Sequence, residues 1–295
     1  MKIQFLNGGL ANQVFQYIFV RFAELYRPTE QWYFDDSFFW VNHVHNGYEL
    51  ENVFGIKANL LSQYFDEDVW KEIIDRKRNG VSLPQTFLDM GISISMLAET
   101  LNYSKLNPFS GEVIMVGANE FHPEITEISR ENLYYHGYWI NKQWLDSYRD
   151  VIQKELKFPV IEDERNIEYA DQIKNSFSIG IHIRRGDFVK LGFAIPPYYY
   201  LDSCKQILNE YPMAEFFVFS DDIEWCRQNA SDMGFNLARK ITYVSGNMDG
   251  NNFRDLQLLS MCRGMIMSNS SFCFLAAILS EQLNFAINPT KREIG

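Results

Sequence analysis

The chain has 295 residues, of which 27 are Lys or Arg and 38 are Asp or Glu, so its net charge is −11. Proteins that mainly bind nucleic acid neutralise phosphates with a basic surface, so this charge argues against that class. With 46% hydrophobic residues the chain can bury a sizeable core, which excludes a disordered protein. An anionic ligand would therefore need positive charge gathered in one place.

Neither a targeting segment nor a membrane span is expected. The longest uninterrupted apolar run, residues 272–279, is far shorter than the roughly 20 residues that a span needs. The cysteines show no CxxC or zinc spacing, so we predict reduced, buried thiols at Cys204, Cys226, Cys262 and Cys273. We expect a cytoplasmic protein, for which peripheral attachment to a membrane stays open.

The first half of the chain begins with a predicted strand over residues 1–6 and a turn at Asn7-Gly8-Gly9. From Leu10 the apolar residues recur at helical spacing until Pro28 ends the run. A second helix is predicted over residues 68–77. A length near 300 residues favours two domains, and we assign residues 1–175 to a first α/β lobe on the acceptor side.

The second half alternates strands and helices. Strands are predicted at 177–183, 216–219, 241–244, 265–267 and 285–287. Helices are predicted at 198–209, from 223, at 253–261 and at 272–282. This alternation predicts a doubly wound, Rossmann-like α/β lobe over residues 176–295.

The strand at 177–183 ends in a charged cluster that contains His182, Arg184, Arg185 and Asp187. His182 and Arg184 share one face of the strand because side chains alternate. Two guanidinium groups at one strand end require an anion or a carboxylate, and Arg matches phosphate bidentately. The alternative is a structural pair between one Arg and Asp187.

Two further strands also end in polar residues. Ser220-Asp221-Asp222 follows the second strand, where a carboxylate can accept from ribose hydroxyls or a base, or can cap the next helix. Asn269, Ser270 and Ser271 precede an apolar helix, and hydroxyls and free amides at a helix start bind anions or cap the helix.

A glycine turn opens the first helix of the chain. Gly8 and Gly9 let backbone amides approach a ligand, with Asn12 and Gln13 just beyond them. The segment is neither a GxGxxG nor a P-loop motif. Ligands of open parallel sheets bind outside the carboxyl ends of the strands, so these clusters together predict a nucleotide diphosphate between two lobes.

Stretches across most of the chain resemble the bacterial-type α-1,2-fucosyltransferases of glycosyltransferase family 11. The resemblance rests on five segments that begin at Gly8, Gly137, His182, Phe219 and Ser268. Among these, the His-x-Arg-Arg-x-Asp and Ser-Asn-Ser-Ser-Phe stretches are specific in combination. The chain departs from the family pattern at Ala11, where Gly is usual, and at Phe188, where Tyr is usual.

The resemblance implies a GT-B-like fold of two Rossmann-like lobes with the donor site in the cleft. It also implies an inverting transfer of L-fucose from GDP-fucose to the 2-hydroxyl of a galactose-terminated glycan, without a metal or other cofactor. Arg184 would bind the β-phosphate, His182 and Asp222 the nucleotide, and Ser270 and Ser271 phosphate oxygens. Guanidinium charge would stabilise the departing GDP, with Arg185 as a second electrophile.

The catalytic base stays open: it could be Asp187, Asp35 or Asp36, or a phosphate oxygen of the donor itself. Two other functions also stay open. A catalytically inactive protein of the same fold would bind a GDP-sugar or a glycan. An NAD-dependent oxidoreductase would need the GxGxxG motif that the sequence lacks.

Two short motifs are interpreted as structural. Asp66-Glu67-Asp68 has the DxD pattern of metal-dependent transferases, but it lies just before a helix without a preceding strand, as a solvated helix start would. His43 and His45 share one face of an extended segment without a third ligand in range.

Overall fold

The computed structural model describes residues 1–43, 46–100, 108–248 and 250–294. It forms two compact units, Met1–Pro159 and Val160–Gly295, each built on a five-stranded parallel sheet. The division thus falls earlier in the chain than the predicted 175/176. The difference is helix α10 (Glu164–Lys174), which packs against α14 (Phe253–Ser260) inside the second unit.

The sheet of the first unit has the strand order β2-β1-β5-β3-β4, and all of its pairings are parallel. Its strands are β1 (Lys2–Phe5), β2 (Trp32–Asp35), β3 (Ser95–Glu99), β4 (Val113–Val116) and β5 (Leu133–His136). The predicted first strand is confirmed, whereas β2 to β5 were not predicted. They are short and lack a regular alternation of apolar and polar residues.

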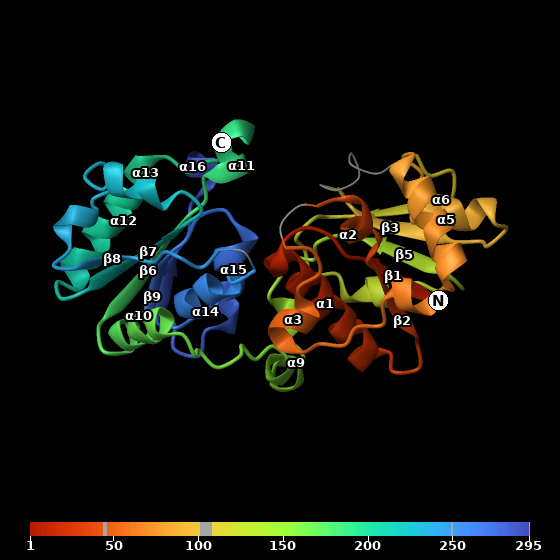
Figure 1. Ribbon diagram of the computed structural model, residues 1–295, viewed down its shortest axis with the longest axis horizontal. Helices are drawn as coiled ribbons and strands as arrows, with labels where there is room; N and C mark the ends of the chain where they lie inside the picture. Colours follow the sequence, from red (N-terminus) through yellow and green to blue (C-terminus); the bar gives the residue numbers. More distant parts are fainter. Residues whose placement is uncertain (44–45, 101–107, 249, 295) are drawn as a thin grey trace. The chain divides into compact units, whose positions relative to one another are not determined.

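Helices cover both faces of this sheet (Figure 1). They are α1 (Leu10–Tyr26), α2 (Ser37–Val41), α3 (Leu50–Phe54), α4 (Leu61–Tyr64), α5 (Glu67–Arg78), α6 (Leu83–Asp89), α8 (Gln143–Asp146) and α9 (Arg149–Glu155), with a 3-10 turn η1 (Pro123–Glu127). The predicted helices at the positions of α1 and α5 are confirmed.

An aromatic core fixes α1 on its face of the sheet. The Phe19 ring stacks on Trp139 at 4.4 Å between centroids and meets Trp32 and Trp144 edge-on. All four side chains are buried, and aromatic pairs stabilise a core beyond their buried area. This packing places Trp139 in the core of the first unit.

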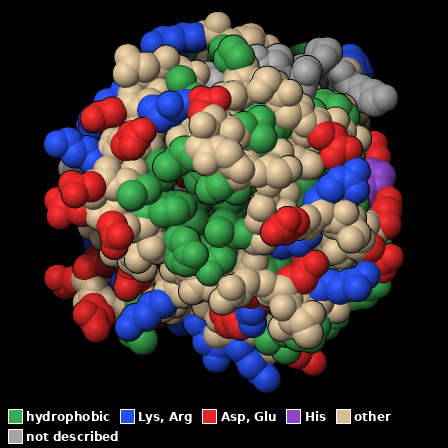
Figure 2. Space-filling model, turned by 90° about the vertical axis from the view of Figure 1, so that its right-hand side faces the viewer, with side chains coloured by type: hydrophobic (Ala, Val, Ile, Leu, Met, Phe, Trp, Pro, Cys, Tyr) green, Lys and Arg blue, Asp and Glu red, His purple; other side chains and the backbone are tan. Residues whose placement is uncertain are grey.

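The opposite face of the sheet packs on α5 and α6 through a second apolar cluster that includes Ile3, Trp70, Phe87 and Met96. Figure 2 shows the face that lies on the right of Figure 1. Hydrophobic side chains gather near the middle of that face, and acidic and basic side chains surround them. The Asp66-Glu67-Asp68 stretch is exposed, and Asp66 is the N-cap residue of α5, as the structural interpretation expects.

The second sheet has the order β10-β9-β6-β7-β8, again all parallel. In chain order this is the 3-2-1-4-5 arrangement of a Rossmann fold. Its strands are β6 (Ser178–Ile183), β7 (Glu215–Ser220), β8 (Ile241–Tyr243), β9 (Gly264–Ile266) and β10 (Phe285–Ile287). All five were predicted, and their positions are confirmed within a few residues.

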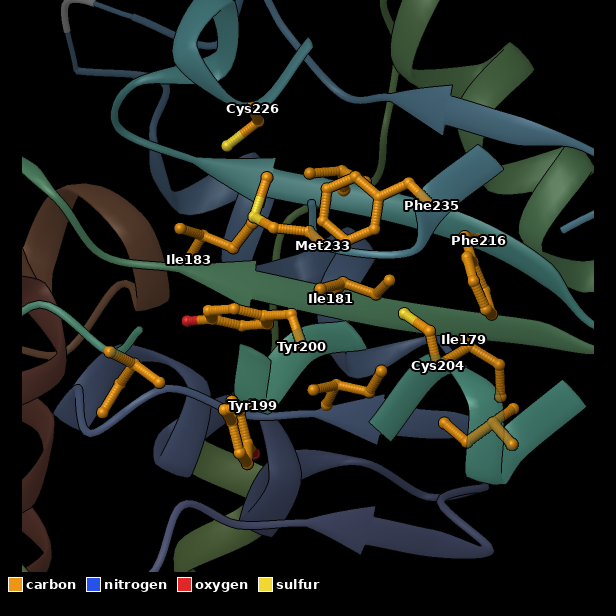
Figure 3. Close-up of a cluster of buried hydrophobic side chains, with 14 of the residues drawn as sticks. Ile179, Ile181, Ile183, Tyr199, Tyr200, Cys204, Phe216, Cys226, Met233 and Phe235 are labelled. Carbon is orange, nitrogen blue, oxygen red and sulfur yellow. The ribbon is translucent and has the colours of Figure 1, made fainter. Parts of the chain in front are cut away.

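The helices of this unit are α10, α11 (Gly186–Leu191), α12 (Pro197–Glu210), α13 (Ile223–Gln228), α14, α15 (Ser271–Leu279) and α16 (Lys291–Ile294), with a 3-10 turn η2 (Phe235–Leu237). On one face of the sheet, Ile179, Ile181 and Ile183 of β6 pack against Tyr200 and Cys204 of α12 (Figure 3). On the other face, a Cβ on Gly180 would lie 2.5 Å from Leu259 of α14, so helix and strand approach closely there.

The four cysteines all lie in the second unit, where they are buried and free, as predicted. Across the part of the chain that the structure describes, no helix is both long and apolar enough to cross a membrane. The predicted structural role of the two histidines concerns His43 and His45, of which His45 lies outside the described residues.

Candidate functional site

Strand β6 is the point at which the second sheet reverses its winding, because β7 and β8 lie on one side of it and β9 and β10 on the other. In open α/β sheets, ligands bind at the carboxyl ends of the strands next to such a reversal. The residues predicted for the second lobe follow β6, β7 and β9, so the structure brings them to this edge.

Arg184 is held by two carboxylates at this edge. Its Nη2 lies 2.8 Å from Asp187 Oδ1 and its Nη1 lies 3.0 Å from Asp221 Oδ2. The Arg184 side chain stays 29% exposed, so the guanidinium group can still meet a ligand. Of the two arginines, it is therefore Arg184 that forms the pair with Asp187.

Arg185 is more enclosed than Arg184. Its Nε donates to Asp222 Oδ2 at 3.2 Å, and its Cζ lies 3.4 Å from the centroid of the Trp225 ring. Stacking of this kind, together with the ion pair, fixes a guanidinium group. The side chain is 19% exposed. Arg185 therefore has a mainly structural role at this edge and is less accessible to a ligand than Arg184.

Two residues of this arrangement were missed by sequence reasoning. Asp221 accepts the backbone N–H of Arg185 at 2.8 Å with Oδ1 while its Oδ2 pairs with Arg184. Trp225 lies under Arg185. The stretch Ser220-Asp221-Asp222 drew attention to both aspartates, but adjacent residues of one type cannot be told apart without geometry.

Asp222 has the two structural roles that its position allows. It is the N-cap residue of α13 and accepts the backbone N–H of Trp225 at 3.3 Å, as the capping interpretation expects. It also pairs with Arg185, and its side chain is 43% exposed.

His182 is buried, and its Nδ1 lies 2.9 Å from Ser268 Oγ. Its ring stacks on Phe272 of α15. Burial, helped by the charge of Arg184, lowers the pKa of His182 to about 3. The imidazole is therefore neutral near pH 7, and it connects the end of β6 to the segment that follows β9.

That segment leads into the amino end of α15. Ser270 is its N-cap residue and accepts the backbone N–H of Phe272 at 3.3 Å. Asn269 donates from Nδ2 to the carbonyl of Phe193 at 2.9 Å, while its Oδ1 is buried without a partner among the described residues. Ser270 and Ser271 are half-buried. A helix start with these groups favours an anion.

The charges at this edge do not sum to a positive site. Arg184 and Arg185 face Asp187, Asp221 and Asp222, which leaves one negative charge in excess. The remaining positive potential comes from the amino end of α15. An anionic ligand must therefore compete with carboxylates for the guanidinium groups.

The glycine turn lies in the first unit. Gly8 has a φ of +78°, and a Cβ there would lie 2.5 Å from Asn12 Nδ2. Gly9 is the N-cap residue of α1, and Gly8, Gly9 and Asn12 are half-buried. Gln13 is buried: its Nε2 donates to the carbonyls of Gly8 and Gly47, and its Oε1 accepts from the backbone of Glu49. Gln13 therefore stabilises the glycine turn through hydrogen bonds of its buried side chain.

The two carboxylates of the first unit considered as bases are both buried. Asp35 accepts from the Tyr134 hydroxyl at 2.7 Å and from the Ser37 backbone. Asp36 accepts from the Trp40 ring and the Ser62 backbone, and burial raises its pKa. Both carboxylates are thus enclosed and already accept hydrogen bonds within the first unit.

Two α/β units, each built on a parallel sheet, define a GT-B-like fold. The fucosyltransferase NodZ from Bradyrhizobium superposes with a TM-score of 0.53 at 11% identity over all of this chain and 96% of that one. Residues 120–292 match the profile of Glycosyl transferase family 11, and the chain belongs to that family. The resemblance noted in the sequence is confirmed.

Relatives over nearly the whole chain carry related names. An alpha-1,2-colitosyltransferase of Escherichia coli is 27% identical over 97% of this chain and 90% of its own length. The O-antigen biosynthesis glycosyltransferase WbnK of Escherichia coli is 24% identical over 93% and 89%. A galactoside 2-alpha-L-fucosyltransferase of Bos taurus is 26% identical over 35% of this chain and 28% of its own length.

Proposed function

We propose that the protein is a galactoside α-1,2-fucosyltransferase that uses GDP-fucose and binds the diphosphate at the carboxyl edge of the second sheet. The observation that carries this proposal is the position of Arg184. It lies partly exposed at the end of β6, and the contact of His182 with Ser268 joins that strand end to the amino end of α15. A guanidinium group and a helix start are the two groups that hold a diphosphate.

In the proposed reaction, the 2-hydroxyl oxygen of a galactose forms a bond to C1 of fucose on the face opposite the leaving group. The bond between C1 and the β-phosphate oxygen breaks, and its electron pair stays on GDP. Arg184 and the amides of α15 stabilise the negative charge that grows there. The hydroxyl proton passes to a base, a role for which the buried Asp35 and Asp36 are unsuited.

We further propose that the reaction needs no metal. Within the described ranges, no three His, Cys, Asp or Glu side chains are grouped so that they could hold a metal ion. Arg184 and the helix start supply the stabilisation that a divalent cation supplies in other transferases. Activity is therefore expected to survive an excess of EDTA.

The test offers the purified protein GDP-fucose with lactose and with type 1 and type 2 disaccharides, and the product linkage is determined by NMR. We expect an α-1,2-linked fucose on galactose, formed with or without EDTA. GDP binding without transfer to any acceptor and without donor hydrolysis would instead identify a catalytically inactive binding protein. Preference for NAD over GDP would contradict the proposal altogether.

A second donor follows from the relatives, since the one matched over 97% of this chain is named a colitosyltransferase. Colitose is L-fucose without its 3-hydroxyl group. The same assay with GDP-colitose beside GDP-fucose separates the two, because a site that hydrogen-bonds the 3-hydroxyl rejects the donor that lacks it. Higher kcat/KM for GDP-colitose would assign that donor.

A further inference from the structure

The guanidinium group of Arg184 is occupied on both of its terminal nitrogens. Asp187 takes Nη2 and Asp221 takes Nη1, at 2.8 and 3.0 Å. A phosphate group binds a guanidinium group bidentately either through both Nη atoms or through Nε and one Nη atom. It would also meet the excess negative charge of this edge. Other N–H donors of the guanidinium group stay available, but a diphosphate that uses them would lie beside both carboxylates, so binding is favoured when one carboxylate leaves Arg184.

The two carboxylates are held very differently. The side chain of Asp187 is 54% exposed, and Arg184 is its one hydrogen-bond partner within the described part of the chain. Asp187 is the second residue of α11, a helix of six residues of which none is buried. An exposed pair of this kind contributes little stability, on the order of 1 kcal/mol or less.

Asp221 is held on three sides. Its side chain is 26% exposed, and its second oxygen accepts the backbone N–H of Arg185 at 2.8 Å. A Cβ on Gly186 would lie 2.7 Å from Asp221 Oδ2, so the carboxylate packs directly against the turn that follows Arg185. Moving Asp221 away would break both its ion pair with Arg184 and its hydrogen bond with the backbone N–H of Arg185, whereas Asp187 would lose its contact with Arg184 alone.

We propose that a nucleoside diphosphate replaces Asp187, and not Asp221, as the partner of Arg184. This inference rests on the proposed function and names how its donor site opens. Asp187 acts as a displaceable counter-ion that holds Arg184 in place before the diphosphate arrives. Asp221 is a positioning residue that keeps the guanidinium group aimed at the ligand throughout.

The experiment is a matched pair of variants at the same arginine, Asp187→Asn and Asp221→Asn. Their dissociation constants for GDP are measured by titration calorimetry at one fixed ionic strength. Asp187→Asn removes the competing charge and is expected to bind GDP about threefold to tenfold more tightly. Asp221→Asn loses the anchoring charge and is expected to bind GDP at least about tenfold more weakly.

Two controls keep the result interpretable. Asp187→Glu retains the competing charge and should restore the GDP affinity of the unmodified protein to within about twofold. Asp202→Asn changes an exposed aspartate on α12 that lies outside the arrangement and should leave GDP affinity unchanged. Thermal unfolding of each variant shows whether it is folded.

Weaker GDP binding by folded Asp187→Asn would overturn the proposal, as would unchanged affinity in both variants of the pair. The same pair also separates this inference from the proposed function. If GDP affinities move in opposite directions but no fucose is transferred, the exchange at Arg184 stands and the transferase proposal fails. If fucose is transferred and both variants weaken GDP binding alike, the reverse holds.

Discussion

The two units of the protein differ in the polar side chains at the carboxyl ends of their parallel strands. At the carboxyl edge of the first sheet, buried polar side chains pair with the chain's own backbone. Glu99 accepts from the backbones of Asn119, Tyr138 and Trp139, and Gln4 bonds the carbonyl of Gly137. At the same edge of the second sheet, Arg184 remains partly exposed and its partners are carboxylates.

The difference shows that topology alone does not locate a ligand. Both sheets reverse their winding and both present strand ends at one edge, so both satisfy the rule for open α/β folds. In the first unit Glu99 and Gln4 are buried and hydrogen-bonded to the backbone, whereas in the second unit Arg184 and Arg185 form ion pairs with aspartates, and we propose that an anion enters one of these pairs. The chemistry of the side chains is therefore the basis on which we assign the proposed diphosphate to the second sheet.

Removing the exposed cation should have the largest effect. Arg184→Ala is expected to lower kcat/KM for GDP-fucose by about 10²–10³, because the variant loses the charge that stabilises the leaving GDP. Lys190→Ala removes an exposed cation of α11 outside the arrangement and should change turnover little. Initial rates with saturating acceptor measure both. Turnover within tenfold of the unmodified protein would place the donor elsewhere.

Removing the carboxylate that accepts backbone hydrogen bonds at the carboxyl edge of the first sheet should lower the stability of the fold and should not act on catalysis directly. Glu99→Ala leaves three backbone N–H groups without their acceptor, two of them 2.6 and 3.0 Å from its oxygens, and should lower the free energy of unfolding by about 3 kcal/mol. Trp139, with a φ of +57°, depends on the same carboxylate. Urea denaturation measures the loss. Glu99→Gln keeps one acceptor oxygen, so its loss of stability should be smaller than that of Glu99→Ala. Equal stability of both variants and the unmodified protein would show that these hydrogen bonds do not stabilise the first unit.

The second unit also contains a buried carboxylate, Asp255 on α14, which accepts from Asn247 Nδ2 at 2.7 Å. Burial raises the pKa of Asp255 from 3.8 to about 6. Between pH 4 and 6, Asp255 is therefore still protonated in the native state but already ionised in the unfolded chain. The stability of the fold consequently decreases as the pH rises from about 4 to 6. Replacing Asp255 by Asn should remove a decline of about 2 kcal/mol across that range. Unfolding followed at several pH values measures it, and an unchanged pH dependence would contradict it.

The smallest effects are expected from removing one helix N-cap hydroxyl in each unit. Ser270→Ala at α15 and Ser82→Ala at α6 each remove a hydroxyl that accepts a backbone N–H at 3.3 Å, so each should cost about 1 kcal/mol of stability. Only the first should weaken GDP binding, by about threefold, because α15 starts at the ligand edge. Equal GDP affinities of the two variants would remove α15 from the site.

Much of the second unit could be predicted from its sequence because its strands are continuous or alternating apolar runs, such as Phe216 to Phe219 of β7. The first unit resisted prediction. Strand β5 lies in the aromatic run that starts at Tyr134 and was interpreted as core packing without a strand. The edge strand β4 has only four residues, and its residues are half-buried apart from the exposed Met115. Short strands of this kind carry no periodic signal.

For the site, the sequence identified the right strand ends but not the pairings between them. Which carboxylate faces Arg184 depends on side-chain geometry across β6 and β7. Adjacent Asp221 and Asp222 are equivalent in sequence yet bind different arginines. Gln13 shows the same limit, since its partners Gly47 and Glu49 come from a distant loop that no local pattern reveals.

The distribution of cysteine gives the molecule an internal reporter. All four thiols lie in the second unit, buried and unpaired, and the first unit has none. A thiol reagent can react with them only when that unit opens, so the labelling rate measures the opening of the second unit separately from that of the first. A nucleotide that binds this half should slow labelling in proportion to its affinity.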